Sequence, residues 1–252
     1  MIFDVLDEEL VPQLSVADRL ILVLYDLGIA TREQIAEISG WSETRIKGAI
    51  QRVRNFGEDG EKDDWIRSWQ PKKNQPRVYS LGERGIEHAR ALRGEYADAR
   101  KRPLQGHVYH FVGLNQILCR LVKAFGRENV RWLSGKEAAS LLYHRLRTGE
   151  EDGQRSPLRP DAMVEVGGKG WWAVEYDCAT ETSIRLEEKF RRYLQLAEMV
   201  IDLQVLFVTV SERRRQQAEW IYDQLRDQLS PIPEGFDIAF LVEGEEPDFL
   251  RP

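Results

Sequence analysis

Apolar residues recur at helical spacing in the first part of the chain, and polar residues mark where each helix would begin. Ser15 can cap a first helix that ends at Gly28. Thr31 and Gln34 have the spacing of a capping box for a second helix, and Ser42 can cap a third. The inward-facing positions are Leu20, Ile21, Val23, Leu24, Leu27, Ile35, Ala36, Ile38, Ile46, Ala49, Ile50 and Val53. The order predicts a helix-turn-helix pattern.

A hairpin is predicted directly after these helices. Residues 65–69 and 77–81 have strand-like composition, and the segment 71–76, with a proline at each end, predicts a turn between them. A fourth helix follows and runs through Leu92. The stretch Tyr-Ser-Leu-x-x-x-Gly at residues 79–85 resembles the end of the wing in many winged helix-turn-helix domains. That resemblance implies a third helix in the major groove and a hairpin along the DNA backbone.

The second half alternates helices and strands. The predicted order is α-β-β-β-α-β-α-β, over about 108–126, 130–133, 160–166, 171–177, 183–200, 205–210, 211–229 and 236–242. Such an order predicts a mixed sheet with helices on both faces. The fold class is therefore a two-domain α+β and α/β chain. We expect a winged helix-turn-helix domain at 1–93, a linker at 94–106 and the mixed-sheet domain at 107–252.

Composition narrows the class of protein without assigning a function. The chain has 252 residues, of which 42% are hydrophobic and 31% charged, so it can bury a core. No apolar run approaches the ~20 residues that span a bilayer, and the first residues are acidic where a signal peptide is basic. Cys119 and Cys178 are too few for a disulfide framework. We expect a cytoplasmic protein without membrane association.

Charge is distributed unevenly, and this points to nucleic acid. The whole chain carries a net charge of −6, but segments 42–54 and 65–80 together carry +7. A phosphate backbone responds to such a local field. The predicted DNA-binding residues are Ser42, Thr44, Arg45, Lys47, Arg52, Arg54, Lys72, Lys73 and Arg77. Two plainer readings stay open: surface helices are commonly basic, and winged helices also serve as protein-interaction modules.

Three carboxylates occupy the strand pair of the second half. Arg-Pro-Asp ends at Asp161, and Glu175 and Asp177 lie on the following strand. The arrangement resembles the PD-(D/E)xK nuclease motif, in which carboxylates on neighbouring strands bind a divalent metal. By that resemblance Asp161, Glu175 and Asp177 would hold Mg²⁺ or Mn²⁺ in a catalytic site, where the metal would activate water and stabilise charge on the phosphate.

The motif's lysine position is occupied by Asp177. Lys189, on the following helix, could point back toward the site and is the fourth catalytic candidate. Alternatives remain: a metal held without lysine, a relic site, or acids that pair with nearby arginines such as Arg159 and Arg185.

Strand register decides whether the three carboxylates share a face. An even-length loop would place Asp161 opposite Tyr176 and turn it away from Glu175 and Asp177. An odd-length loop or a bulge, which the glycines among residues 167–170 make easy, would put all three on one face.

The combined layout resembles the plasmid replication-relaxation family. The features are the winged-helix pattern, Pro-Asp-Ala-Met-Val at 160–164, and Val-Glu-Tyr-Asp-x-x-Thr-Glu-Thr at 174–182, then Lys189 and Tyr193 on a helix. The resemblance implies a double-stranded-DNA-binding protein of a plasmid or other mobile element, linked to replication or mobilisation. Expected partners include proteins of those processes, and a homodimer is one expected assembly. The competing hypotheses are a metal-dependent DNA endonuclease and a protein-interaction scaffold.

Overall fold

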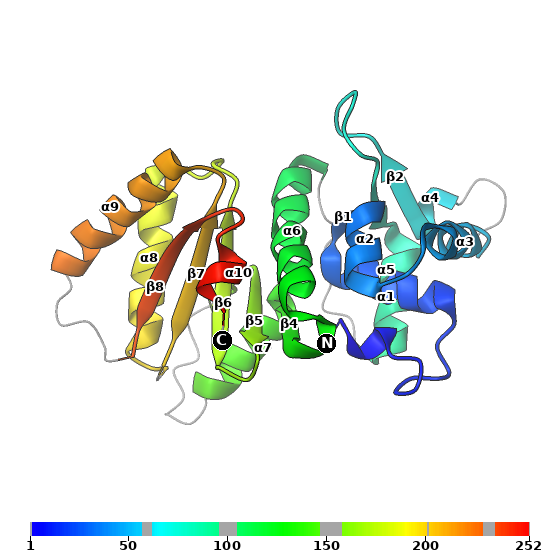
Figure 1. The fold of residues 1–252 in the computed structure, drawn as a ribbon, viewed down its shortest axis with the longest axis horizontal. Coiled ribbons are helices and arrows are strands. Elements are labelled where there is room, and N and C mark those ends of the chain that lie inside the picture. The colour runs from blue at the N-terminus through cyan, green and yellow to red at the C-terminus, as the bar shows by residue number, and fades with distance from the viewer. Residues whose placement is uncertain are drawn as a thin grey trace. The chain divides into compact units, whose positions relative to one another are not determined.

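The chain forms two compact units, Met1–Lys123 and Ala124–Pro252. The structure, a computed structural model, describes residues 2–56, 62–95, 105–146, 158–200, 202–228 and 235–251 (Figure 1). No helix in these ranges combines the length and apolar character needed to cross a membrane.

Three capped helices begin the first unit after a short 3-10 turn, η1 (Asp4–Leu6). They are α1 (Val16–Leu27), α2 (Arg32–Ser39) and α3 (Glu43–Arg54). Capping boxes at Ser15 and Thr31 satisfy the first backbone N–H groups of α1 and α2, as the sequence predicts for Thr31. Gly40 ends α2 with a φ of 67°, a left-handed conformation that glycine adopts without strain.

A small antiparallel sheet completes the first unit with two more helices. Its strands are β1 (Ile29–Thr31), β2 (Ile66–Trp69) and β3 (Val78–Leu81), in the order β1-β3-β2. The predicted hairpin is therefore formed by β2 and β3, and β1 is an addition that the sequence did not indicate. The remaining helices are α4 (Lys62–Trp65) and α5 (Glu83–Arg93).

The helix α6 (Val108–Phe125) packs on the first unit over most of its length. The side-chain amide of buried Asn115 donates to the backbone oxygens of Leu27 at 3.1 Å and Ile29 at 2.9 Å. Val108 packs with Ile29 in a small apolar cluster. The sequence placed this helix in the second domain from residue 107, whereas the second compact unit begins at Ala124. Most of the expected linker, residues 96–104, lies outside the described residues.

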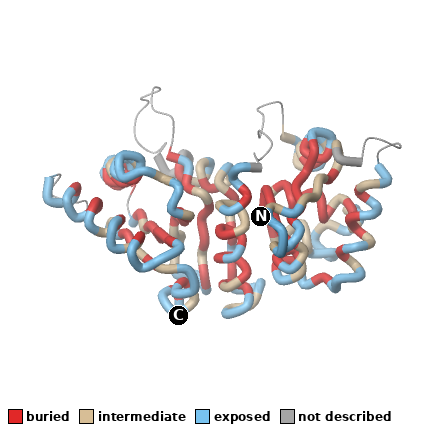
Figure 2. Tube along the Cα trace, turned by 90° about the horizontal axis from the view of Figure 1, so that it is seen from above, coloured by how far each residue is buried: buried red, intermediate tan, exposed pale blue. Residues whose placement is uncertain are grey.

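The second unit is built on a five-stranded mixed sheet, as predicted. Its order is β4-β5-β6-β7-β8, antiparallel from β4 to β6 and parallel from β6 to β8. The strands are β4 (Val130–Ser134), β5 (Ala162–Val166), β6 (Trp171–Asp177), β7 (Gln204–Thr209) and β8 (Asp237–Val242). Figure 2 shows mostly buried residues along the central strands.

Three helices pack on one face of this sheet, and a short helix contacts the other. The helices α7 (Gly135–Leu146), α8 (Ser183–Ala197) and α9 (Glu212–Gln228) contribute to one apolar cluster with the strands. On the opposite face, Phe249 of α10 (Glu246–Phe249) makes an edge contact with Trp172, with ring centroids 5.2 Å apart. The sequence did not indicate α7 or α10. Odd-numbered residues of β6 point toward α8 and α9, and this side carries the carboxylates.

Candidate functional site

The N-terminal turn of α3 carries three of the residues predicted to contact DNA. The Ser42 hydroxyl oxygen caps the helix by accepting from the backbone N–H of Arg45 at 3.3 Å. Thr44 is exposed. The Arg45 guanidinium lies 4.9 Å from the centroid of the Trp41 ring and also pairs with the carboxylate of Glu8. Arg45 is therefore held beside the start of α3, and Glu8 is a partner that the sequence did not predict.

Further along α3 the predicted basic residues differ in their surroundings. Lys47 is exposed and pairs with Glu43 one turn earlier at 3.0 Å. Arg52 is exposed, and Arg54 is half-buried against the hairpin. An exposed ion pair of the Lys47 type contributes little to stability, so Lys47 stays available to another anion.

Ser68 on β2 connects α3 to the hairpin. Its hydroxyl oxygen accepts from Arg54 at 3.0 Å and from Arg77 at 3.3 Å. Two guanidinium groups from separate basic segments thus meet at one side chain. The helix and the hairpin therefore present their positive charge side by side.

The loop between β2 and β3 carries the remaining predicted residues. Lys72 and Lys73 are both exposed. The Lys72 ammonium lies 5.3 Å from the centroid of the Tyr109 ring, and the Tyr109 hydroxyl donates to Gln75 at 3.3 Å. Tyr109 of α6 therefore contacts two residues within the loop, while Lys73 is exposed.

In the second unit, strand register places the three carboxylates on one face. Ala162 pairs with Val174 and Glu165 with Trp171, so five residues separate the last paired positions. This odd-length connection continues the register to place Asp161 opposite Glu175. Positive φ angles at Gly167, Gly168 and Gly170 make the turn. The odd-loop alternative from the sequence is the one that occurs.

Glu175 and Lys189 form the centre of a buried charge cluster. Lys189 Nζ lies 2.9 Å from Glu175 Oε2 and 3.2 Å from Glu181 Oε2. The Tyr193 hydroxyl, one turn further along α8, donates to Glu175 Oε1 at 2.6 Å. Asp161 faces the same cluster, and its Oδ2 accepts from the backbone N–H of Tyr176 at 2.9 Å. As the sequence anticipated, Lys189 points back to the strand pair.

Burial governs the ionisation of this cluster. It raises the pKa of Glu175 to about 7, against the opposing pull of the Lys189 charge, while Asp161 adds to the rise. Burial alone would lower the pKa of Lys189, but the carboxylates of Glu175, Asp161 and Glu181 outweigh it and raise that pKa above its ordinary value. Lys189 is therefore a permanent cation of the site.

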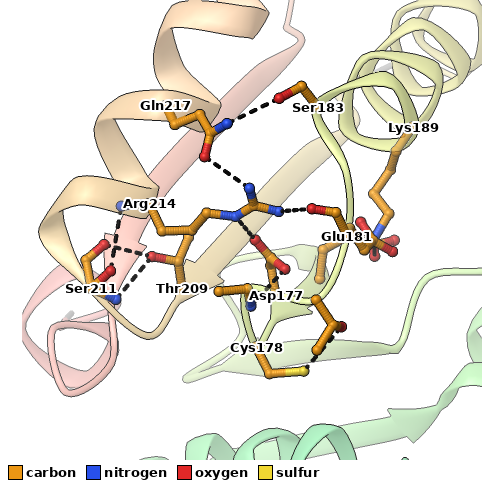
Figure 3. A network of polar contacts seen from close by, with 12 residues as sticks. Asp177, Cys178, Glu181, Ser183, Lys189, Thr209, Ser211, Arg214 and Gln217 are labelled. Atoms are coloured by element: carbon orange, nitrogen blue, oxygen red, sulfur yellow. Dashed lines mark hydrogen bonds and ion pairs between the residues drawn. The ribbon is translucent and has the colours of Figure 1, made fainter.

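Asp177 lies on the same face but pairs with an arginine and not with Lys189; the contacts of the two basic residues meet at Glu181 (Figure 3). Its buried carboxylate pairs with Nε of Arg214 on α9, and its Oδ1 accepts from the N–H of Ala179 at 2.9 Å. The same guanidinium donates to the backbone oxygen of Glu181 at 2.7 Å and to Gln217 at 2.9 Å. Asp177 is thus neutralised by an arginine that the sequence did not single out.

The contacts of the three carboxylates conflict with the divalent-metal site that the sequence predicts. Mg²⁺ requires oxygen ligands at about 2.0–2.1 Å in a near-octahedral shell. Both oxygens of Glu175 are engaged by Lys189 and Tyr193, and the Asp177 carboxylate is engaged by Arg214. Among the described residues, no three His, Cys, Asp or Glu side chains are grouped so that they could hold a metal ion. As folded, these residues do not fit a divalent metal.

The family model described as replication-relaxation matches residues 22–205, well over half of the chain. The chain belongs to the replication-relaxation family. The matched range covers α3, the hairpin, the carboxylates and Lys189. No curated protein and no solved structure matched the chain. Membership of the replication-relaxation family suggests a role in plasmid replication or mobilisation.

Proposed function

We propose that this replication-relaxation protein binds double-stranded DNA of a plasmid or other mobile element and acts in its replication, its mobilisation or their regulation. The first unit is the DNA-binding module, a winged helix-turn-helix in which α3 enters the major groove and the β2–β3 hairpin forms the wing. The second unit is a nuclease-like module without cleavage activity.

One observation carries the DNA-binding proposal. Ser68 accepts from Arg54 of α3 and from Arg77 of the hairpin, so the two basic segments form one surface. Arg52 on α3 and Lys73 at the loop are exposed. A helix for the groove and a basic loop for the adjoining phosphates is the division of contacts that DNA readout uses.

The test is the salt dependence of binding to a labelled duplex, measured by fluorescence anisotropy with the full chain. We compare the wild type with a double variant, Arg52→Gln with Lys73→Gln. Each lost phosphate contact should reduce the slope of log affinity against log salt by about 0.9, so the double variant should lose about two units of slope. Arg45→Ala with Lys47→Ala should weaken binding and test the start of α3.

The matched control removes two exposed basic residues from the second unit, Lys169→Gln with Arg213→Gln. Its salt slope should equal that of the wild type. An Arg52/Lys73 variant that behaves like this control would refute the proposed surface. Absence of salt-dependent binding in the wild type would instead favour a protein-interaction scaffold.

The placement of Asp161, Glu175 and Asp177 on one face is the observation that favours the alternative, a metal-dependent endonuclease. The engagement of Glu175 by Lys189 and Tyr193, and of Asp177 by Arg214, supports a non-catalytic module instead. Incubation of supercoiled plasmid with Mg²⁺ or Mn²⁺ separates the two. Nicking by the wild type that is lost in Asp161→Ala and in chelator would establish the endonuclease; we expect no nicking.

A further inference from the structure

We infer that Lys189 is the resident cation of the carboxylate cluster in the second unit and fills the place that a divalent metal would otherwise take. The inference goes beyond the proposed function, because it holds whether or not the first unit binds DNA. It rests on the contacts of Lys189 and on the disagreement between the carboxylates and a metal shell.

The position of the ammonium is the first argument. Lys189 Nζ lies 2.9 Å from Glu175 and 3.2 Å from Glu181, and it interacts electrostatically with Asp161. The cation thus lies among carboxylates from the end of β6, the loop after it and the residue before β5. A metal that bridged Asp161 and Glu175 would have to displace it.

Burial is the second argument. The Glu175 side chain is 4% exposed and the Lys189 side chain 19%. Buried carboxylates need a compensating charge, because an isolated ion loses its hydration. Lys189 supplies that charge from within the chain, so the cluster is already compensated when the protein folds.

The orientation of α8 gives Glu175 a second contact from the same helix as Lys189. Tyr193 is one turn beyond Lys189, fully buried, and donates to the other oxygen of Glu175 at 2.6 Å. Lys189 and Tyr193 therefore both contact the Glu175 carboxylate from one face of α8, as their four-residue spacing allows. A metal would have to break this pairing as well as the charge balance.

The inference predicts that removing the lysine creates a metal site. In Lys189→Met the long apolar chain is kept, but Asp161, Glu175 and Glu181 lose their cation. Mn²⁺ should then bind at Glu175 at least about tenfold more tightly than in the wild type, the factor that about 1.4 kcal/mol of relieved repulsion gives. The carboxylates would then bind a metal ion where the wild type has the Lys189 ammonium.

The experiment measures Mn²⁺ bound to the full chain by electron paramagnetic resonance of the free ion. Wild type and Glu175→Gln should bind the same amount, since the wild-type cluster takes no metal. Lys189→Met should bind additional Mn²⁺, and Lys189→Met with Glu175→Gln should lose that gain. Lys169→Met, at an exposed lysine of the same unit, should match the wild type.

Two outcomes would overturn the inference. One is Mn²⁺ binding by the wild type that Glu175→Gln abolishes; the other is a folded Lys189→Met that gains no Mn²⁺. If Lys189→Met is unfolded in chelator, circular dichroism should show it folding when Mn²⁺ is added. If it stays unfolded with Mn²⁺, Lys189→Gln replaces it, and the comparison of wild type with Glu175→Gln still decides the first outcome.

Discussion

The two units hold their charged residues in opposite ways. In the first unit, basic side chains gather on α3 and the hairpin, and Lys47, Arg52, Lys72, Lys73 and Arg77 are exposed. In the second unit, acidic side chains gather inside, where Glu175 pairs with Lys189 and Asp177 with Arg214.

The difference separates charge that is available to a ligand from charge that stabilises the fold. Exposed basic residues cost little to leave unpaired and attract phosphate. Buried carboxylates must be compensated when the chain folds. The resemblance of the second unit's residues to a catalytic motif therefore does not decide their role; their partners do.

The largest expected effect comes from removing the buried arginine. Arg214→Ala would leave the buried Asp177 carboxylate with the Ala179 N–H as its one remaining partner among the residues that the structure describes. Breaking a buried pair in this way costs about 3–5 kcal/mol of unfolding free energy. Urea denaturation followed by circular dichroism measures the loss, and hydrogen exchange of β6 and β7 assigns it to the second unit.

The neighbouring residue gives a matched control. Arg213 precedes Arg214 on α9 and is exposed, so Arg213→Ala should stay within about 0.5 kcal/mol of the wild type. Equal losses in both variants would mean that Arg214 acts as an ordinary surface residue. The claim that the buried Asp177 carboxylate needs a paired cation, unlike the exposed charges, would then be wrong.

A smaller effect is expected when Glu175 loses a neutral donor. Tyr193→Phe keeps the buried ring and removes the hydroxyl that donates to Glu175 at 2.6 Å. An unsatisfied buried acceptor costs about 1–3 kcal/mol. Urea denaturation followed by circular dichroism measures this loss of unfolding free energy.

Tyr222→Phe is the comparison for this variant. Tyr222 lies in the same apolar cluster, and within the described ranges its hydroxyl shows no hydrogen bond. Its removal should leave the unfolding free energy nearly unchanged. A Tyr193→Phe variant as stable as Tyr222→Phe would show that Lys189 alone satisfies Glu175.

Local patterns predicted much of this molecule. The caps at Ser15, Thr31 and Ser42 placed three helices, and the apolar periodicity placed the central strands of the second sheet. Three-residue β1 is too short for a period of two to be recognised. The apolar face of α6 predicted a helix but could not say which unit it packs on, because an apolar stripe does not specify its partner.

Such local patterns could not predict ion pairs between residues that are far apart in the sequence. Arg214 and Asp177 are 37 positions apart, as are Arg45 and Glu8. Arg213, Arg214 and Arg215 are adjacent in the sequence, and only the way α9 lies on the sheet decides that the middle one is buried. The position of Lys189 beside the carboxylates was predictable because the motif directed attention to a nearby lysine, whereas Arg214 had no such signal.

The smallest expected effect sharpens the description of the first unit's surface. Its acidic N-terminal segment is held by buried Arg19, whose guanidinium donates to the backbone oxygens of Val5 at 2.6 Å and Asp7 at 3.0 Å. This anchoring keeps Glu8 beside Arg45. If Arg45 contacts DNA, binding must first break that ion pair.

Glu8→Gln should therefore raise affinity for duplex DNA, by less than about fivefold because the pair is exposed, and steepen the salt slope. Anisotropy titrations measure both quantities. Glu9→Gln removes the same charge one position away and is the control, so a gain confined to Glu8→Gln isolates the contact with Arg45. A loss of affinity in Glu8→Gln would reverse the interpretation. Glu8 would then hold Arg45 in the position that binds DNA, and the exposed ion pair would favour the DNA complex.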